Sequence, residues 1–164
     1  MLKLFLLRHA KSSWDDIALL DIERPLGNRG LKDAPQMGKY FAKKHKKPHI
    51  IISSPARRAR ETAELFADAI EYKIEKILYD QHIYEAPLDE LMHVIYGIED
   101  AFERVMLVGH NPGFTNLANY LTEGVNIDNI PTCGLFGVEF DVKSWKKVEA
   151  KKGKFLFFDY PKKH

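Results

Sequence analysis

The sequence predicts an α/β fold with three layers, α/β/α, in which a mostly parallel central sheet ends in an antiparallel edge. Two observations support this prediction. Strand-like and helix-like segments alternate over most of the chain, which is typical of a parallel sheet with helices on both faces. Near the C-terminus, Gly134 to Val142 and Trp145 to Ala150 are separated only by Lys143-Ser144, and this spacing favours an antiparallel pair.

The strongest strand candidates are short apolar runs bounded by polar or turn-forming residues. They are Leu2 to Leu7, His49 to Ser53 and Val105 to Val108. Their near-continuous apolar character is typical of strands that are covered on both faces. A shorter strand near Ile74 to Leu78 and a last edge segment at Phe155 to Phe158 complete the expected sheet.

Two helices with a clear apolar period are expected in the first half of the chain. The first has Asn28 as its N-cap and runs to about Lys44, and Pro35 should bend it or delay its start. The second has Pro55 in its first turn and runs to about Ile70. The expected inner faces are Leu31, Ala34, Met37 and Phe41 in the first helix, and Ala59, Ala63, Phe66 and Ile70 in the second.

Two further helices are expected in the second half. One spans Pro87 to Phe102, and its apolar positions are Leu88, Leu91, Met92 and Ile95. The other runs from Pro112 to about Leu121, with Gly124 just past its end.

Length and composition predict one domain over residues 1–164, because 45% of the residues are hydrophobic, enough for a real core. The net charge of +2 does not demand a nucleic-acid partner, and the lysines at 43–47 are expected to form a solvated helix end. No apolar stretch is long enough to span a membrane. The single Cys133 excludes an internal disulfide and a cysteine-rich zinc site, which favours a cytoplasmic location.

Polar residues stand where the three strongest strands end: Arg8-His9, Ser53-Ser54 and Gly109-His110. Ligands of such sheets bind at the carboxyl ends of the strands, so we expect these side chains to meet at one edge. An arginine and a histidine side by side suit the handling of an oxyanion, because guanidinium donates paired hydrogen bonds and imidazole can attack or carry protons.

These residues predict a phosphate site. Arg8 and one arginine among Arg57, Arg58 and Arg60 could clamp a phosphate, and His110 could donate a hydrogen bond to it. His9 is the best-placed nucleophile, since Cys133 has no basic neighbour in sequence and no serine elbow or Walker loop is present. No metal-ligand signature such as His-Glu-x-x-His occurs, so we expect chemistry without a metal or other cofactor.

Four blocks in order resemble the histidine phosphatase superfamily, which has the phosphoglycerate-mutase-like fold, and within it the small SixA-type phosphohistidine phosphatases. The blocks are Leu7-Arg8-His9-Ala10-Lys11-Ser12-Ser13-Trp14, Glu23-Arg24-Pro25-Leu26 with Arg29-Gly30, the segment Ser53 to Ala63, and Val108-Gly109-His110-Asn111-Pro112. Pro131-Thr132-Cys133-Gly134 is similar too, so the resemblance covers nearly the whole chain. The chain departs from the pattern at Glu61, where the superfamily often has glutamine, and at Pro35.

The resemblance implies a role for each matching residue. His9 would be the phosphorylated nucleophile, with Arg8 and His110 binding the phosphate. Among the clustered arginines, Arg58 matches the family position, because it precedes Ala59 and stands four places before Thr62.

Two further residues are weaker matches to a role. Ser12 lies where its hydroxyl or a loop amide could reach the phosphate. Glu85 is the nearest candidate for the general acid that larger relatives supply from this region, and the alternative interpretation is a surface loop carboxylate. The imidazole released from phosphohistidine can be protonated near neutral pH, so a strong acid is not essential.

The segment between Ala63 and Val105 is used up in covering the sheet, so the sequence predicts a histidine phosphatase domain without a lid insertion. An open edge admits a phosphorylated side chain of a folded protein. The expected partner is therefore a phosphorylated protein, carrying phosphohistidine, and the expected product is phosphate. The alternatives are a small-molecule phosphomonoesterase of the same fold, a non-catalytic phosphoprotein-binding module, and a nucleic-acid-binding protein that uses the lysine cluster.

Overall fold

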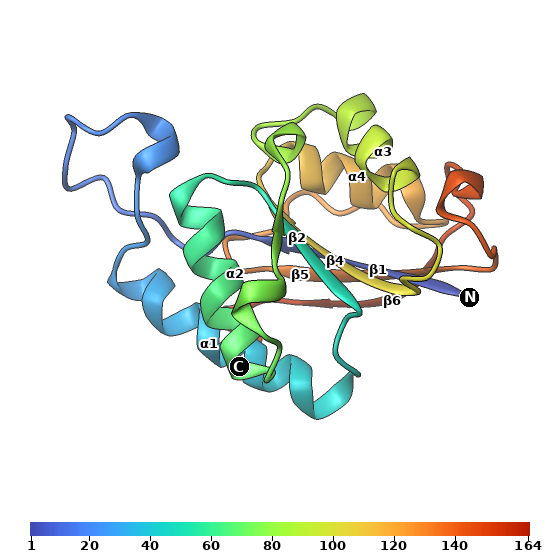
Figure 1. Ribbon diagram of the computed structural model, residues 1–164, viewed down its shortest axis with the longest axis horizontal. Coiled ribbons are helices and arrows are strands. Elements are labelled where there is room, and N and C mark those ends of the chain that lie inside the picture. Colours follow the sequence, from blue (N-terminus) through green and yellow to red (C-terminus); the bar gives the residue numbers. More distant parts are fainter.

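The computed structural model describes residues 1–164, which build one six-stranded sheet with helices on both faces (Figure 1). The strands are β1 (Leu2–Arg8), β2 (Ile50–Ser53), β3 (Leu78–Tyr79), β4 (Arg104–Gly109), β5 (Leu135–Phe140) and β6 (Lys154–Asp159). The α-helices are α1 (Asn28–Lys44), α2 (Arg57–Ala69), α3 (Leu88–Tyr96) and α4 (Gly113–Leu121). Short 3-10 turns include η1 (Asp21–Glu23), η2 (Ile74–Lys76), η3 (Gln81–Ile83) and η4 (Trp145–Lys147).

The strand order in the sheet is β3-β2-β4-β1-β5-β6. β4 pairs in parallel with β1 and β2, and β2 pairs in parallel with β3. β5 runs antiparallel to β1 and to β6. The expected mostly parallel sheet with an antiparallel edge is confirmed. β1 and β4 lie side by side at its centre, where the chain changes from one side of the sheet to the other, and this is where ligands bind in such folds.

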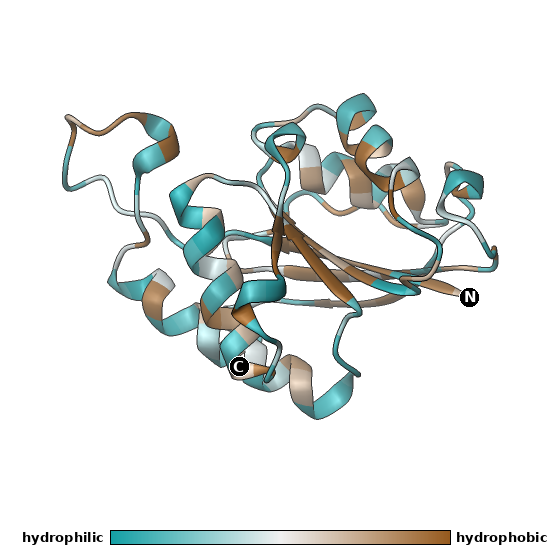
Figure 2. Ribbon diagram, in the orientation of Figure 1, coloured by the Kyte–Doolittle hydropathy of each residue, from teal (hydrophilic) through white to brown (hydrophobic).

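Each face of the sheet has its own apolar core. Along β1, Leu4 and Leu6 join one core and Phe5 and Leu7 the other, as alternation along a strand requires. The first core is completed by α3 and α4, and the second by α1 and α2. Figure 1 shows these helix pairs on opposite faces, and Figure 2 shows the hydrophobic strands between them. The three-layer prediction is therefore confirmed.

Small residues bring α1 and α2 close together. A Cβ on Gly38 would lie 2.7 Å from Cβ of Ala69 and 3.0 Å from the Phe66 carbonyl oxygen. This close approach of the two helices selects glycine and alanine for the contact.

The predictions for α1 are confirmed in part. Its inner face is confirmed for Ala34, Met37 and Phe41 and is wrong for Leu31, which is exposed. The helix has Gly27 rather than Asn28 as its N-cap, and Pro35 does not delay its start.

The predicted strand from Trp145 to Ala150 is wrong. Trp145 is fully buried and starts the turn η4, because its indole N–H donates to the Phe102 carbonyl at 2.7 Å and its backbone N–H to Asp100 at 3.0 Å. The antiparallel partner of β5 is β6 instead.

Two other boundaries also differ from prediction. Ile74–Lys76 is a 3-10 turn, which leaves β3 only two residues long. Helix α3 ends at Tyr96 rather than Phe102 because Gly97 caps it.

Residues 9–27 leave β1 at its carboxyl end and project beyond the sheet before α1 begins (Figure 1, blue). Both ends of this loop are tied down. Ser12 and Leu26 form an antiparallel bridge, Gly27 N–H donates to the Lys11 carbonyl at 2.9 Å, and Leu26 N–H donates to the Glu61 carboxylate at 2.9 Å. None of the helices has the length and hydrophobicity that a membrane-spanning helix requires.

Candidate active site

The central strands bring the two predicted histidines together. Arg8 of β1 lies opposite Gly109 of β4 in parallel register, so His9 and His110 follow at the same edge of the sheet. The His9 backbone N–H donates to the Gly109 carbonyl at 3.0 Å, and the two imidazole ring centres are 5.3 Å apart. Both side chains are buried. The expectation that the strand ends converge is thus met in space.

Arg58 is the arginine that reaches this place from α2. It is 3% exposed, and its Nη1 and Nη2 donate to the Asp21 carbonyl at 2.8 Å and the Asp21 carboxylate at 3.0 Å. Arg57 and Arg60 point elsewhere and pair on the helix surface with Glu61 and Glu64. Among the three arginines that the sequence offered, the fold therefore selects Arg58.

Arg8 is held by the segment before β5. Its Nη1 donates to the Ile130 carbonyl at 2.8 Å, and the Asn111 amide donates to the same oxygen at 2.9 Å. The Nε atoms of Arg8 and Arg58 are buried without a partner. Buried donors without partners are costly, so two guanidinium groups in this state are well suited to an anionic ligand.

The surroundings of His9 fix its tautomer. Its Nδ1 lies 2.7 Å from the Ala10 carbonyl oxygen, which can only accept, so Nδ1 carries the hydrogen and Nε2 keeps its lone pair. Burial, together with the charges of Arg58, Arg8 and Arg24, lowers the pKa of His9 to about 4. The ring is therefore neutral at pH 7, and its free nitrogen is a nucleophile.

The partner of His110 is Ser54, which the sequence predicted at the same edge of the sheet without giving it a role. Nε2 of His110 lies 2.7 Å from Ser54 Oγ, which also accepts the Ala56 backbone N–H at 3.2 Å. Nδ1 of His110 is buried and has no partner. Burial, then the neighbouring His9 and Arg58, lower the pKa of His110 to about 3. A neutral His110 thus has one nitrogen satisfied by protein and one left over.

Asp21 and Tyr84 were also missed by the sequence reasoning. The Tyr84 hydroxyl donates to the Asp21 carboxylate, which accepts from Arg58 as well. Burial would raise the pKa of Asp21, but the hydrogen bond from Tyr84 and the charge of Arg58 outweigh it and lower that pKa to about 2. Burial and the same hydrogen bond raise the pKa of Tyr84 to about 12. Asp21 lies just before the Arg24-Pro25 block, and only that proximity could have drawn attention to it.

The remaining predicted residues line the same pocket. The Ser12 hydroxyl accepts from Arg24 Nη1 at 2.7 Å, and Arg24 also contacts Asp21 at 3.3 Å. The Glu85 carboxylate lies at the rim, 59% exposed and 3.8 Å from Arg58 Nη2. Thr62 links the segment after β1, which carries His9, to α2, which carries Arg58. Its hydroxyl accepts from Ala10 N–H at 2.9 Å and donates to the Arg58 carbonyl at 2.7 Å.

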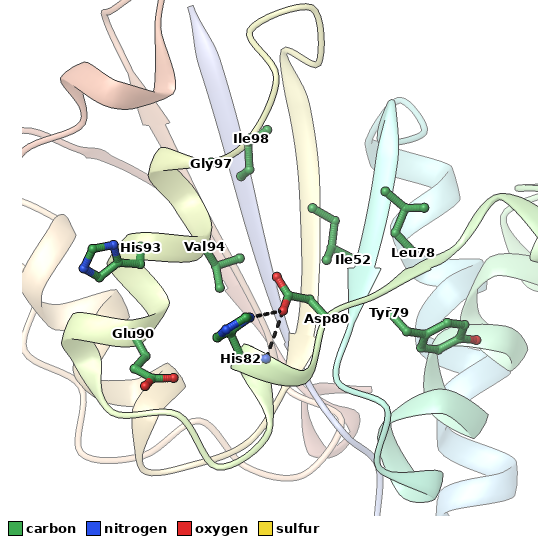
Figure 3. A pocket seen from close by; sticks show the side chains of 10 residues that line it. All are labelled: Ile52, Leu78, Tyr79, Asp80, His82, Glu90, His93, Val94, Gly97 and Ile98. Atoms are coloured by element: carbon green, nitrogen blue, oxygen red, sulfur yellow. Dashed lines mark hydrogen bonds and ion pairs between the residues drawn. The ribbon is translucent and has the colours of Figure 1, made fainter.

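Together these side chains enclose a pocket of about 330 Å³. Its lining includes every residue that the sequence predicted for the site: Arg8, His9, Ser12, Arg58, Glu85 and His110. Three guanidinium groups, a neutral imidazole with a free lone pair and a second neutral imidazole suit phosphoryl transfer, in which catalysis is mostly positioning and charge stabilisation. A larger hollow of about 570 Å³, between β3 and α3, contains none of these residues (Figure 3).

Comparisons with known proteins agree with this geometry. The family model of the histidine phosphatase superfamily, branch 1, matches residues 4–92. An uncharacterized chloroplastic protein of Arabidopsis thaliana is 32% identical over 160 residues, which cover 92% of this chain and 72% of that protein.

The similarity extends to solved structures. A putative phosphohistidine phosphatase SixA from Agrobacterium tumefaciens has a TM-score of 0.81 at 26% identity, with 98% of each chain covered. A protein histidine phosphatase SixA solved with tungstate has a TM-score of 0.81 at 18% identity, with 96% of each chain covered, and shows the same fold. The matched family segment spans more than half of the chain and contains the nucleophile candidate and Arg58. The protein therefore belongs to branch 1 of the histidine phosphatase superfamily and is of the SixA type.

Proposed function

We propose that this protein is a metal-independent phosphatase that works through a phosphohistidine intermediate and removes phosphate from phosphohistidine on a cytoplasmic protein. The observation that carries the proposal is the hydrogen bond from His9 Nδ1 to the Ala10 carbonyl at 2.7 Å. It leaves the Nε2 lone pair free in a pocket that Arg8 and Arg58 also line. A side chain that only bound phosphate would need a donor at this nitrogen, whereas a nucleophile needs the lone pair.

The reaction has two displacements. In the first, His9 Nε2 forms a bond to phosphorus while the P–N bond to the substrate imidazole breaks, and the released imidazole takes up a proton. In the second, water attacks the phosphorus of phospho-His9, the P–Nε2 bond breaks and inorganic phosphate leaves. Arg8, Arg58 and a hydrogen bond from His110 Nδ1 stabilise the charge on the phosphoryl oxygens in both steps.

Two residues have supporting roles in this proposal. Glu85 stands at the rim, where its carboxyl can pass a proton to the leaving group, and its contribution is small because imidazole is readily protonated near neutral pH. Ser12 lies beside Arg24 in the pocket lining, where its hydroxyl contacts the phosphate.

The size of the pocket supports a protein substrate. A volume of about 330 Å³ is at the low end of the ~300–1,000 Å³ range typical of small-molecule sites, enough for a phosphoryl group and the ring that carries it. The helices after Ala63 pack on the sheet and leave no inserted segment to cover the pocket. A phosphorylated side chain projecting from a folded protein can therefore reach it.

The test is to trap the intermediate with a labelled phosphohistidine protein and to map the label. We expect an acid-labile label on His9, and turnover at least about 10³-fold lower in His9→Asn. Full activity in His9→Asn would overturn the proposal. A clear preference for sugar phosphates or phosphoglycerate over the phosphohistidine protein would show a small-molecule phosphatase instead. Binding of the phosphohistidine protein without turnover would show a binding module.

A further inference from the structure

We propose that the loop from Trp14 to Glu23 is the surface that holds the phosphorylated protein, and that this partner presents apolar and basic side chains around its phosphohistidine. The inference rests on the proposed function and adds the chemistry of the partner. We call these residues the docking loop.

The docking loop exposes large apolar side chains. Trp14 is 66% exposed, Ile17 is 95% exposed and Leu20 is 67% exposed. Figure 2 shows a hydrophobic (brown) stretch at the tip of the loop that follows β1, and this tip projects away from the sheet and its helices. Scattered single apolar residues on a surface are normal, but three on one short loop beside a pocket indicate an interaction site.

The loop is continuous with the phosphate pocket. Trp14 and Asp21 both line that pocket. The Arg24 guanidinium lies 3.5 Å from the centre of the Trp14 ring and donates to the Ser13 carbonyl, so the first turn of the loop is fixed in place. The far end is held by Asp21 against Arg58 and Tyr84. A protein whose phosphorylated side chain enters the pocket therefore has to lie against Trp14.

The charge of the docking loop indicates which kind of protein it binds. Asp15, Asp16 and Glu23 are exposed, and no lysine or arginine occurs from Ser12 to Glu23. The loop is thus acidic although the chain as a whole carries a net charge of +2. A complementary partner has basic groups around its apolar contact, and such complementarity raises the association rate and selects among partners.

One other surface competes for this role. The hollow between β3 and α3 is lined by apolar side chains, among them Ile52 and Leu78, and by polar ones, among them Asp80, His82 and His93 (Figure 3). None of its lining residues lines the phosphate pocket. Because the two surfaces share no lining residue, variants in each of them separate the alternatives.

The decisive experiment compares a protein substrate with a small one. The probes are histone phosphorylated on histidine with phosphoramidate, and the free amino acid phosphohistidine. We expect Ile17→Ser with Leu20→Ser to lower kcat/KM for phosphohistone at least about tenfold, through KM, and to change turnover of free phosphohistidine less than about twofold. Leu78→Ser is the matched control, because Leu78 is 53% exposed and lies in the competing hollow.

Each other outcome has a definite meaning. The docking role of the loop would be overturned by equal losses of kcat/KM on both probes, by no loss on phosphohistone, or by a larger loss in Leu78→Ser. Wild-type protein that turns over neither probe would instead overturn the proposed function, and the docking role with it.

A charge variant gives an independent readout. Asp15→Asn with Glu23→Gln removes two exposed carboxylates. We expect a raised KM for phosphohistone, a weaker dependence of that KM on salt, and a lowered KM for an acidic protein phosphorylated in the same way. Unchanged salt dependence would contradict the basic character assigned to the partner.

Discussion

At the scale of single residues, the site works by hydrogen bonds that decide which nitrogen carries a hydrogen. Ser54 Oγ accepts the Ala56 N–H at 3.2 Å. The Ser54 hydroxyl in turn donates its own hydrogen to His110 Nε2, which lies 2.7 Å away and is the one acceptor near it. A neutral His110 then bears its hydrogen on Nδ1, the buried atom without a partner. An arriving phosphate would satisfy that donor.

Replacing Ser54 therefore tests the tautomer of His110. In Ser54→Ala, we expect kcat to fall about tenfold, less than the 10²–10³ typical when a charge-stabilising donor is lost outright, with little change in KM. Nitrogen-15 spectra of the imidazole should show Nε2 gaining hydrogen. Ser53→Ala is the matched control, because the equally buried Ser53 hydroxyl donates to the Ser54 carbonyl at 2.9 Å and does not touch His110. Equal effects of the two variants would count against this role.

Asp21 occupies Arg58 when no phosphate is bound. In Asp21→Asn we expect inorganic phosphate to bind about fivefold more tightly, since a partly exposed ion pair of this kind is worth about 1 kcal/mol. The pKa of Tyr84 should fall from about 12, because the carboxylate that raises it is gone. Calorimetry and a spectroscopic titration of tyrosine measure the two effects.

Glu85→Gln is the comparison for Asp21, since Glu85 contacts Arg58 only at 3.8 Å and should change phosphate affinity less. Weaker phosphate binding in Asp21→Asn would mean that the carboxylate orients Arg58 rather than competing with the ligand.

The sequence predicted the residues at strand ends and missed those that act across the chain. Arg8, His9 and His110 were predictable because register alone brings the carboxyl ends of neighbouring parallel strands together. Asp21 and Tyr84 were not, because their contact joins a turn in a loop to a turn before α3, 63 residues later. No periodicity records such a contact, and only the packed structure reveals it.

At the scale of elements, the loop after β1 and the start of α1 are positioned by a glycine. A Cβ on Gly30 would lie 2.3 Å from the Lys11 carbonyl oxygen and 3.1 Å from the Lys11 backbone nitrogen. Neither backbone atom can move without shifting the loop, and Lys11 lines the phosphate pocket. The helix thus begins where it does because its third residue has no side chain.

Gly30→Ala should consequently destabilise the protein by about 1–3 kcal/mol, as overpacking against a rigid neighbour does, and weaken phosphate binding. Urea unfolding measures the first effect. Gly97→Ala is the control at the end of α3, where the nearest atom would be 3.5 Å from the new Cβ, an ordinary contact. A fully stable Gly30→Ala protein would show that the loop is free to move.

Element types were predicted well where the local signal is strong, as in the apolar period of α1 and α2 and the continuous apolar runs of β1 and β4. The error at Trp145 has a definite cause. Trp145 and Val148 are residue types that favour strands, but a tryptophan whose indole N–H donates to the Phe102 carbonyl stabilises a tight turn instead. Tertiary hydrogen bonds override local pattern in such short segments.

At the scale of the whole molecule, the buried histidines make the stability of the fold depend on pH. Burial is the largest cause of the low pKa values of His9, about 4, and His110, about 3. In the unfolded chain both titrate near the ordinary value of 6.5. Below pH 6.5 the unfolded state therefore binds more protons than the folded state, and the free energy of unfolding decreases as the pH falls.

We expect the free energy of unfolding to decrease between about pH 6.5 and pH 4, by up to about 1.4 kcal/mol per pH unit for each histidine. Asp21 has its pKa at about 2 against an ordinary 3.8, so its contribution is lost only at lower pH. Urea midpoints measured across this range are the readout. His110→Gln should give a shallower dependence, and an unchanged one would mean that His110 is not buried in solution.

The fold class and the place of the site were predictable at this scale because the alternation of elements leaves few arrangements of a parallel sheet. The position of the loop after β1, which brings Trp14, Asp21 and Arg24 into the pocket lining, was not predictable, since a loop without period carries no signal of where it packs. Arg24 and Asp21, which pin that loop, are identifiable only from their contacts.

The floor beneath the nucleophile contains the single thiol of the chain. Cys133 is fully buried, burial raises its pKa, and its backbone N–H donates to the His9 carbonyl at 3.0 Å. A maleimide can reach this sulfur only while the segment that carries it has detached from the end of β1. The rate at which maleimide alkylates Cys133 therefore reports the local opening of the segment that holds His9 in place. This measurement needs no engineered probe.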